Sequence, residues 1–167
     1  MSLNVGSRGG AGSPGALGAR RSRRLLSLRD TARAMSQENV EIVRRSLALL
    51  DQGDDPYDLV APEFVLDFSR RLLNPVVVGG RDQVRAFAEG EGQMWEGGHL
   101  AYQPKELIDA GDKVLALVRV SGRGQASGVE VEAYTWVVWT FRDGKPVEWT
   151  YFGDDRASAL EAVGLSE

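Results

Sequence analysis

Four apolar segments between residues 102 and 152, separated only by short turns, constrain the fold of this chain more than any other feature. They are Tyr102–Ile108, Lys113–Val120, Val129–Phe141 and Val147–Phe152. The third is rich in β-branched and aromatic residues, which favour strands. Asp109-Ala110-Gly111-Asp112 and Asp143-Gly144 are turn sequences typical of hairpins, and Ser121–Gly128 supplies the turn between the two pairs. The spacing therefore predicts four antiparallel strands joined by hairpins.

The residues before these strands have a helical period instead. The apolar positions with this period are Val40, Val43, Leu47 and Leu50. Their steps of three and four residues predict a helix from Ser36 to Leu50, with Ser36 as its N-cap and Gly53 just beyond its end. A short second helix is predicted from Asp54 to Val60, and a third helix begins near Asp82.

Two short extended segments and a last helix complete the pattern. Phe64–Phe68 is predicted to be a strand, and Val76–Val78 to be extended within a loop over residues 69–80. Asp154 or Asp155 can cap a last short helix. This order of elements predicts an α+β domain with a mostly antiparallel sheet.

Charge divides the chain into two unlike parts. Residues 1–34 contain seven arginines and one aspartate, a charge of +6, so that residues 35–167 carry −10 of the total of −4. The first part is also rich in Gly, Ser and Ala, which cannot bury enough apolar surface to order a chain. We expect residues 1–34 to be a disordered basic tail and residues 35–167 to be the folded domain. The apolar run Leu25–Leu28 is too short for a secretory leader, so a cytoplasmic location is expected.

The composition excludes several kinds of chemistry. The chain has no Cys, which rules out disulfides, thiolate nucleophiles and iron–sulfur clusters. Its one histidine, His99, cannot form a multi-histidine metal site, and a lone loop histidine is more often solvated than catalytic. No apolar run approaches 18 residues, and an acidic body is a poor partner for phosphates. We therefore expect no metal, no cofactor, no nucleic acid and no membrane contact.

Four segments carry a family resemblance: SQENVEIVRRSLALLDQGDDPYDLVAPEFVLDFSR, GGRDQVRAFAEG, ELIDAGDKVLALVRVSGRG and WTFRDGKPVEWTYFGDDRASALEAVGL. Together they span most of residues 36–165 and resemble the nuclear transport factor 2-like superfamily, in its SnoaL-like branch of actinobacterial type. The resemblance implies a cone in which a curved, mostly antiparallel sheet wraps around three helices and encloses a pocket. Its members are commonly homodimers. They include isomerases, epoxide hydrolases, dehydratases, polyketide cyclases and non-catalytic binding proteins, so the fold alone does not decide the function.

Residue by residue, the resemblance completes none of these catalytic sets. Asp67 lies near the position of the isomerase base, but Ser46 and Val137 stand where the two oxyanion donors should be. His99 is a weak candidate for cyclase or dehydratase chemistry. Arg119 matches the arginine of the epoxide hydrolases, whereas both of their aspartates are replaced, by Ser121 and Thr150.

An alignment with the family through Gly53 and the Asp143-Gly144 turn predicts which strand residues face the interior of the cone. They are Leu117, Arg119, Ser121, Val131, Ala133, Thr135, Val137, Trp139 and Thr150. Asp67 is the catalytic candidate, and Arg119 either anchors a ligand carboxylate or forms a purely structural ion pair with Asp67. The other ligand-binding candidates are Ser121, Thr135, Val137, Trp139, Thr150 and Trp95, although tryptophans are more often part of a core.

The opposite face of the sheet is predicted to be aromatic and uncovered. It would show Val118, Val120, Tyr134, Trp136, Val138, Trp149 and Tyr151. A patch of this kind on a monomer would be abnormal, because Tyr and Trp are enriched at interfaces. We therefore predict a two-fold homodimer through Tyr134, Trp136, Trp149 and Tyr151.

Three functions follow from these expectations. The first is a homodimer that binds a small, mainly hydrophobic metabolite and performs metal-free acid–base chemistry of the isomerase, cyclase or dehydratase type. The second is a non-catalytic ligand-binding or sensing dimer. The third is a structural partner whose cone is filled by side chains. The sequence leaves these open, together with the identity of the ligand.

Overall fold

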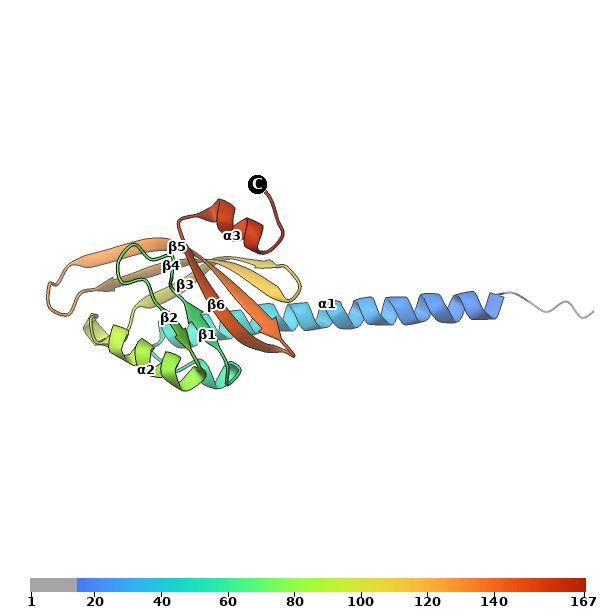
Figure 1. Ribbon diagram of the computed structural model, residues 1–167, viewed down its shortest axis with the longest axis horizontal. Helices are drawn as coiled ribbons and strands as arrows, with labels where there is room; N and C mark the ends of the chain where they lie inside the picture. The colour runs from blue at the N-terminus through green and yellow to red at the C-terminus, as the bar shows by residue number, and fades with distance from the viewer. Residues whose placement is uncertain (1–14) are drawn as a thin grey trace, which may run out of the picture. The chain divides into compact units, whose positions relative to one another are not determined.

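The computed structural model describes residues 15–167, with side chains from residue 27 onward. The chain divides into two compact units, the first ending at Ala32 and the second covering Arg33–Glu167. Helix α1, Gly15–Asp51, contributes to both (Figure 1). Within the described residues, no helix is long and apolar enough to cross a membrane.

Two further helices and two short 3₁₀ turns belong to the second unit. They are α2 (Arg81–Gly92), α3 (Arg156–Ala162), η1 (Tyr57–Leu59) and η2 (Glu96–Gly98). The strands are β1 (Val65–Asp67), β2 (Val77–Gly79), β3 (Ala101–Asp109), β4 (Lys113–Arg123), β5 (Glu130–Arg142) and β6 (Lys145–Gly153). They form one six-stranded sheet in the order β2-β1-β6-β5-β4-β3, in which only β1 and β6 are parallel. The predicted α+β class and the mostly antiparallel, curved sheet are confirmed.

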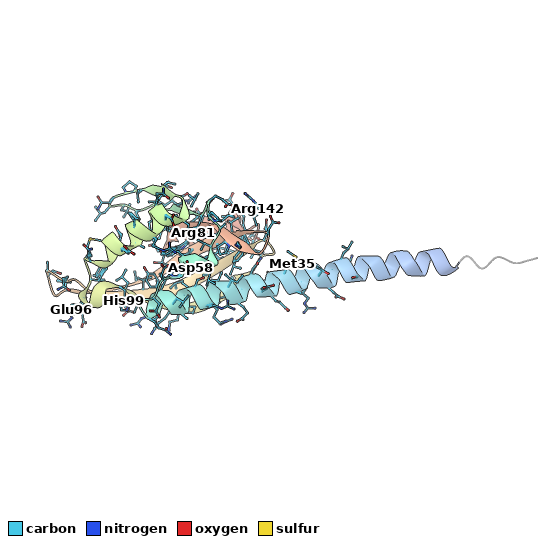
Figure 2. The ribbon with its side chains drawn as sticks, turned by 90° about the horizontal axis from the view of Figure 1, so that it is seen from below. Met35, Asp58, Arg81, Glu96, His99 and Arg142 are labelled. Atoms are coloured by element: carbon cyan, nitrogen blue, oxygen red, sulfur yellow. The ribbon has the colours of Figure 1, made fainter. Side chains whose placement is uncertain are left out.

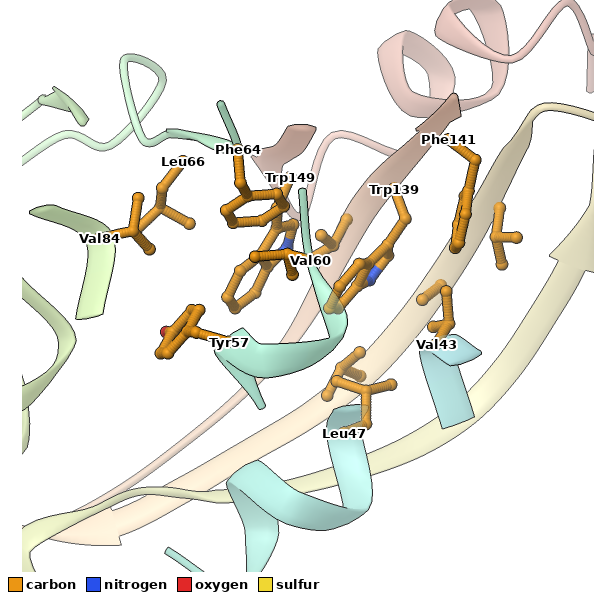
Figure 3. Close-up of a cluster of buried hydrophobic side chains, with 14 of the residues drawn as sticks. Val43, Leu47, Tyr57, Val60, Phe64, Leu66, Val84, Trp139, Phe141 and Trp149 are labelled. Atoms are coloured by element: carbon orange, nitrogen blue, oxygen red, sulfur yellow. The ribbon is translucent and has the colours of Figure 1, made fainter. Parts of the chain in front are cut away.

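The main core lies between one face of the sheet and the helices α1 and α2. Val43 and Leu47 of α1 are fully buried there, as the helical period of the sequence predicts. They pack in one cluster with rings from the sheet, including Trp139 and Trp149 (Figure 3). This face of the sheet is therefore the interior of the cone.

The first helix begins earlier than the sequence pattern predicts. Helix α1 starts at Gly15 rather than at Ser36, so part of the segment expected to be a disordered tail is helical. No proline or glycine interrupts residues 19–51, and Ala, Leu and Arg are good helix formers, so nothing in this stretch stops the helix. Residues 1–14 lie outside the described residues, and the boundary between tail and domain stays a prediction.

Helix α3 covers part of the other face of the sheet, which was predicted to be uncovered. Helix α3 packs its Ala159 and Leu160 against Leu115, Trp136 and Val138 in a second buried cluster. Figure 1 shows α3 on the side of the sheet opposite α2. Asp155 caps α3 by accepting a hydrogen bond from the Ser158 backbone N–H at 3.0 Å, which lowers the pKa of its carboxyl group.

The predicted facing of β6 is wrong because of a β-bulge. Phe141 pairs with Pro146, but Thr140 pairs with Glu148, so Val147 is an extra residue on β6. One extra residue moves every following side chain to the other face. Trp149 and Tyr151 therefore face the interior of the cone.

The predicted facing of β4 is also wrong. Leu117 lies directly opposite Trp136, and directly opposed residues share a face. Both belong to the cluster under α3, whereas Val118 and Val120 pack inside the cone. The predicted dimer residues thus do not form one patch: Trp136 lies under α3, Trp149 and Tyr151 line the interior, and Tyr134 is 51% exposed.

Candidate functional site

A pocket of about 240 Å³ opens inside the cone. Its wall is formed by the end of α1, the η1 segment, β1, α2, the η2 loop, β3 and β6. The lining residues are Leu50, Gly53, Asp54, Asp55, Pro56, Tyr57, Leu66, Phe68, Arg71, Arg85, Phe87, Ala88, Glu89, Glu91, Gly92, Trp95, Gly98, His99, Leu100, Tyr102 and Trp149. The cone is therefore not filled by its own side chains, as a purely structural role would require.

Two glycines allow the segments around the pocket mouth to approach closely. Gly53 has a φ of +79°, and a Cβ there would lie 2.8 Å from the His99 ring. Gly92, at the end of α2, has no room for a Cβ because the Gly98 carbonyl oxygen occupies that place. His99 itself is half-buried and lines the pocket, with its Nδ1 3.1 Å from the Gly97 oxygen (Figure 2).

Aromatic rings form the apolar part of the wall. Phe68 meets Trp149 edge to face with ring centroids 5.8 Å apart, and Phe87 at 6.1 Å. Behind this layer, Trp139 stacks on Trp149 with centroids 5.4 Å apart and an interplanar angle of 11°. These contacts fix the Trp149 ring as a rigid wall of the pocket.

The two arginines of the wall are both paired with carboxylates. Arg71 donates from Nη1 to Glu91 Oε2 at 3.2 Å, and its guanidinium lies 3.6 Å from the Phe68 ring centroid. Arg85 of α2 binds three carboxylates: Asp55 at 2.6 Å, Asp58 at 2.9 Å and Asp82 at 3.3 Å. The hydrogen bond that Arg85 donates to Asp55 is the main cause of a raised pKa of Arg85. Arg85 thus ties α2 to the η1 segment.

Two phenols, Tyr57 and Tyr102, line the same pocket. The Tyr57 backbone N–H donates to Asp55 Oδ1 at 2.7 Å, and that of Tyr102 to Asp51 Oδ1 at 2.9 Å. Burial raises the pKa of both phenols, and each stays protonated at neutral pH. Among residues 15–167 we find no hydrogen bond made by either hydroxyl, so both donors are free to bind a ligand.

Asp67 does not reach this pocket. Leu66 lines the cavity, and because strand side chains alternate, Asp67 projects to the other face. Its Oδ1 accepts a hydrogen bond from the Ser69 backbone N–H at 2.9 Å. The structure therefore separates the predicted catalytic residue from the cavity.

Arg119 also lies outside the cone. Its Nη2 donates to Glu132 Oε2 at 2.8 Å and its Nη1 to Gln103 Oε1 at 3.0 Å. The hydrogen bond between Arg119 and Glu132 raises the pKa of the Arg119 guanidinium and lowers the pKa of the Glu132 carboxyl group. The predicted ion pair between Asp67 and Arg119 does not form in the described part of the chain.

The remaining predicted residues are divided between the two faces. Ser121 follows Arg119 on the outward side of its strand pattern, and Thr150 donates to Glu148 Oε1 at 2.7 Å there. Thr135, Val137 and Trp139 are buried on the interior side, but only as support behind the wall. Of the predicted ligand-binding residues, Trp95 alone lines the pocket among the described residues.

Sequence reasoning missed Arg85, Glu91 and the two phenols among the polar residues that line the pocket. Arg71 and Glu91 are 20 positions apart and meet only because the loop after β1 folds over α2. Tyr57 had a usable signal, since it directly follows Asp55-Pro56 at the start of a predicted helix. Tyr102 was assigned to a strand whose facing the β-bulge between Pro104 and Glu106 makes hard to predict.

The two phenols make the stability of the fold sensitive to alkaline pH. Because the folded pKa of Tyr57 is raised, its stabilising effect is complete below the unfolded pKa of about 10 and is lost as pH rises above that value. We expect Tyr57 to cost about 1.4 kcal/mol of unfolding free energy per pH unit above about 10. Urea unfolding at pH 9 and pH 11 should show this loss, reduced in Tyr57→Phe and unchanged in Tyr134→Phe. Equal losses in both variants would contradict burial as its cause.

Comparisons with known proteins agree with this fold. The family model described as SnoaL-like domain matches residues 43–149. No curated protein matches the sequence. A candidate SnoaL-like polyketide cyclase from Jannaschia sp. CCS1 is a similar solved structure, with 25% identity, a TM-score of 0.59, and coverage of 71% of this chain and 86% of its own.

Two more distant structures share the fold and contain small molecules. TerC, co-crystallised with polyporic acid, has 20% identity, a TM-score of 0.59, and coverage of 76% of this chain and 98% of its own. A protein of ketosteroid isomerase-like fold from Catenulispora acidiphila DSM 44928, in complex with trimethylamine, has 19% identity and a TM-score of 0.58. The match covers 75% of this chain and 93% of the Catenulispora protein. At these identities the likeness concerns the fold alone.

Proposed function

Since this chain belongs to the SnoaL-like domain family, we propose that it binds a small, mainly hydrophobic molecule in the pocket inside its cone. The observation that carries the proposal is the open cavity of about 240 Å³ with aromatic walls. A pocket with apolar walls and few polar groups is the usual form of a small-molecule site. Stacking behind Trp149 keeps the wall in place without a ligand, which favours binding.

Acid–base turnover is the second candidate function, with a new residue in the role first given to Asp67. Glu91 lines the cavity, where its Oε2 accepts a hydrogen bond from Arg71, and both groups act electrostatically on the protonated Tyr102. A carboxylate and a neutral phenol in one pocket form a base and an acid. Turnover of an enone or hydroxy-ketone by the wild type, lost in Glu91→Gln, would support this function; equal activity in both would exclude Glu91.

We also retain homodimer assembly and a cytoplasmic location as proposals. The predicted interface through four aromatic residues is not retained. Trp136 and Trp149 are buried within the chain, and Tyr151 is partly buried inside the cone. The exposed Tyr134 on β5 is the one that keeps a free surface. Sedimentation velocity of the wild type tests the assembly directly, and a monomer at micromolar concentration would contradict it.

Filling the pocket should weaken binding without unfolding the protein. Ala88 of α2 lines the cavity, whereas Ala86 on the same helix is exposed. We expect Ala88→Trp to weaken binding of 1-aminoanthracene, a neutral fluorophore that brightens in apolar surroundings, by at least about tenfold, which corresponds to about 1.4 kcal/mol. A fluorescence titration measures the change.

Ala86→Trp is the matched control, because it adds the same side chain to the same helix outside the cavity. It should bind the fluorophore as the wild type does. Equal weakening in both variants would mean that the probe binds elsewhere, and no binding to the wild type would remove the support for a hydrophobic ligand.

A further inference from the structure

The mouth and the depth of the pocket differ in charge. The carboxylate residues Asp54, Asp55 and Glu89 are exposed at the mouth. Tyr57, by contrast, is only 6% exposed and carries a neutral hydroxyl. Water therefore screens the charges of these three carboxylates, whereas it does not reach most of the Tyr57 side chain.

This arrangement disfavours an anionic ligand. The two guanidinium groups of the wall, on Arg71 and Arg85, already bind carboxylates within the described structure. The wall contains two guanidiniums and both are paired, so an added anion would find no unpaired guanidinium there. It would also have to displace Glu91 from Arg71 to gain a partner.

A cationic ligand is disfavoured for a different reason. The one partly buried carboxylate of the wall, Glu91, is already held by Arg71. The wall also offers the protonated phenols of Tyr57 and Tyr102, whose O–H groups need an acceptor, and an ammonium ion has no lone pair to accept them. An exposed carboxylate at the mouth adds little attraction, because solvent and salt screen it.

The two phenols instead call for a neutral acceptor. A ligand that removes water from these hydroxyls without accepting from them leaves each donor unsatisfied, which costs affinity. A carbonyl oxygen has two lone pairs and no donor group of its own, so it can accept hydrogen bonds from phenol hydroxyls. We propose that the ligand is an uncharged apolar molecule with a carbonyl oxygen, which accepts hydrogen bonds from Tyr57 and Tyr102. This inference deepens the proposed function and rests on it.

A matched set of four naphthalenes tests the polar end of the ligand at constant ring size. Isothermal titration calorimetry would compare 2-acetylnaphthalene, 2-ethylnaphthalene, 2-naphthoate and 2-naphthylmethylammonium. We expect the ketone to bind about tenfold more tightly than the hydrocarbon, the effect of two modest hydrogen bonds. Both ions should bind more weakly than the ketone.

Variants of the phenols assign the preference to these residues. Tyr57→Phe/Tyr102→Phe should make the ketone and the hydrocarbon bind equally, and Tyr102→Phe alone should remove about half of the tenfold preference on a logarithmic scale. Tyr134→Phe, which removes an exposed hydroxyl, should preserve the whole preference. Circular dichroism establishes that each variant is folded.

Several outcomes would overturn the inference while leaving the proposed function in place. Equal wild-type affinity for ketone and hydrocarbon would do so, as would tightest binding of either ion. A ketone preference that survives in the double variant would also exclude the phenols. If none of the four naphthalenes binds and 1-aminoanthracene does not bind either, the proposed function itself fails, and this inference with it.

Discussion

Replacing Trp139 by alanine is expected to lower the unfolding free energy by about 3–5 kcal/mol, the usual cost of removing a fully buried large aromatic ring. Trp139 is 2% exposed and stacks on Trp149, and it packs in the cluster that joins α1 to the sheet. Few cores can collapse around a void of that size. Urea unfolding measures the loss when both proteins are fitted with the same slope of unfolding free energy against urea concentration.

Two further substitutions separate the causes of this loss. Tyr134→Ala removes an aromatic ring that is 51% exposed and should cost less than about 1 kcal/mol. Trp139→Phe keeps part of the stack and removes an indole Nε1–H that has no hydrogen-bond partner in the described structure. It should therefore cost clearly less than Trp139→Ala. Similar losses for Trp139→Ala and Tyr134→Ala would contradict the central place of Trp139 in the core.

Two glycines on α2 should respond to alanine with opposite signs. A Cβ on Gly92 would collide with the Gly98 carbonyl oxygen, and its distance to the carbonyl carbon would be 3.3 Å. Because backbone atoms cannot rotate away, the end of α2 and the η2 loop must separate. We expect Gly92→Ala to cost about 1–3 kcal/mol and to weaken binding in the pocket, since Gly92 and Gly98 line its mouth.

Gly90→Ala is the matched control on the same helix. No atom lies within 4 Å of its added Cβ, so the substitution brings only the better helix propensity of alanine. The unfolding free energy should rise by up to about 1 kcal/mol. Thermal unfolding and 1-aminoanthracene titration of both variants test the pair, and a destabilised Gly90→Ala would contradict the open space around that position.

Much of the secondary structure follows from local patterns in the sequence. The Asp143-Gly144 turn has Asp143 at a φ of 52° and Gly144 at 76°, the left-handed values that such a hairpin requires. The spacing of Val43 and Leu47 likewise predicted the buried side of α1. Such signals are local, because they depend on backbone preferences and on the period of the apolar residues.

Local patterns could not predict to which side of the sheet each strand side chain points. A single extra residue at Val147 moves Trp149 from one side of the sheet to the other, and no local preference announces it. The alignment on the Asp143-Gly144 turn omitted this bulge, so it placed Thr150 inside the cone and Trp149 outside. An error of one residue in the facing of β4, where the pairing with β5 has no bulge, placed Arg119 in the pocket.

The sequence by itself determined the order of elements, the fold family and the chemical groups available: carboxylates, guanidiniums, hydroxyls and one imidazole. Only the tertiary structure decided which of these groups meet. Glu91 of α2 and Arg71 of the loop after β1 come together with Tyr57 and Tyr102 through long-range packing. Asp67 and Arg119 are separated from the cavity by the alternation of strand side chains, since a shift of one residue exchanges the inside of the sheet for the outside.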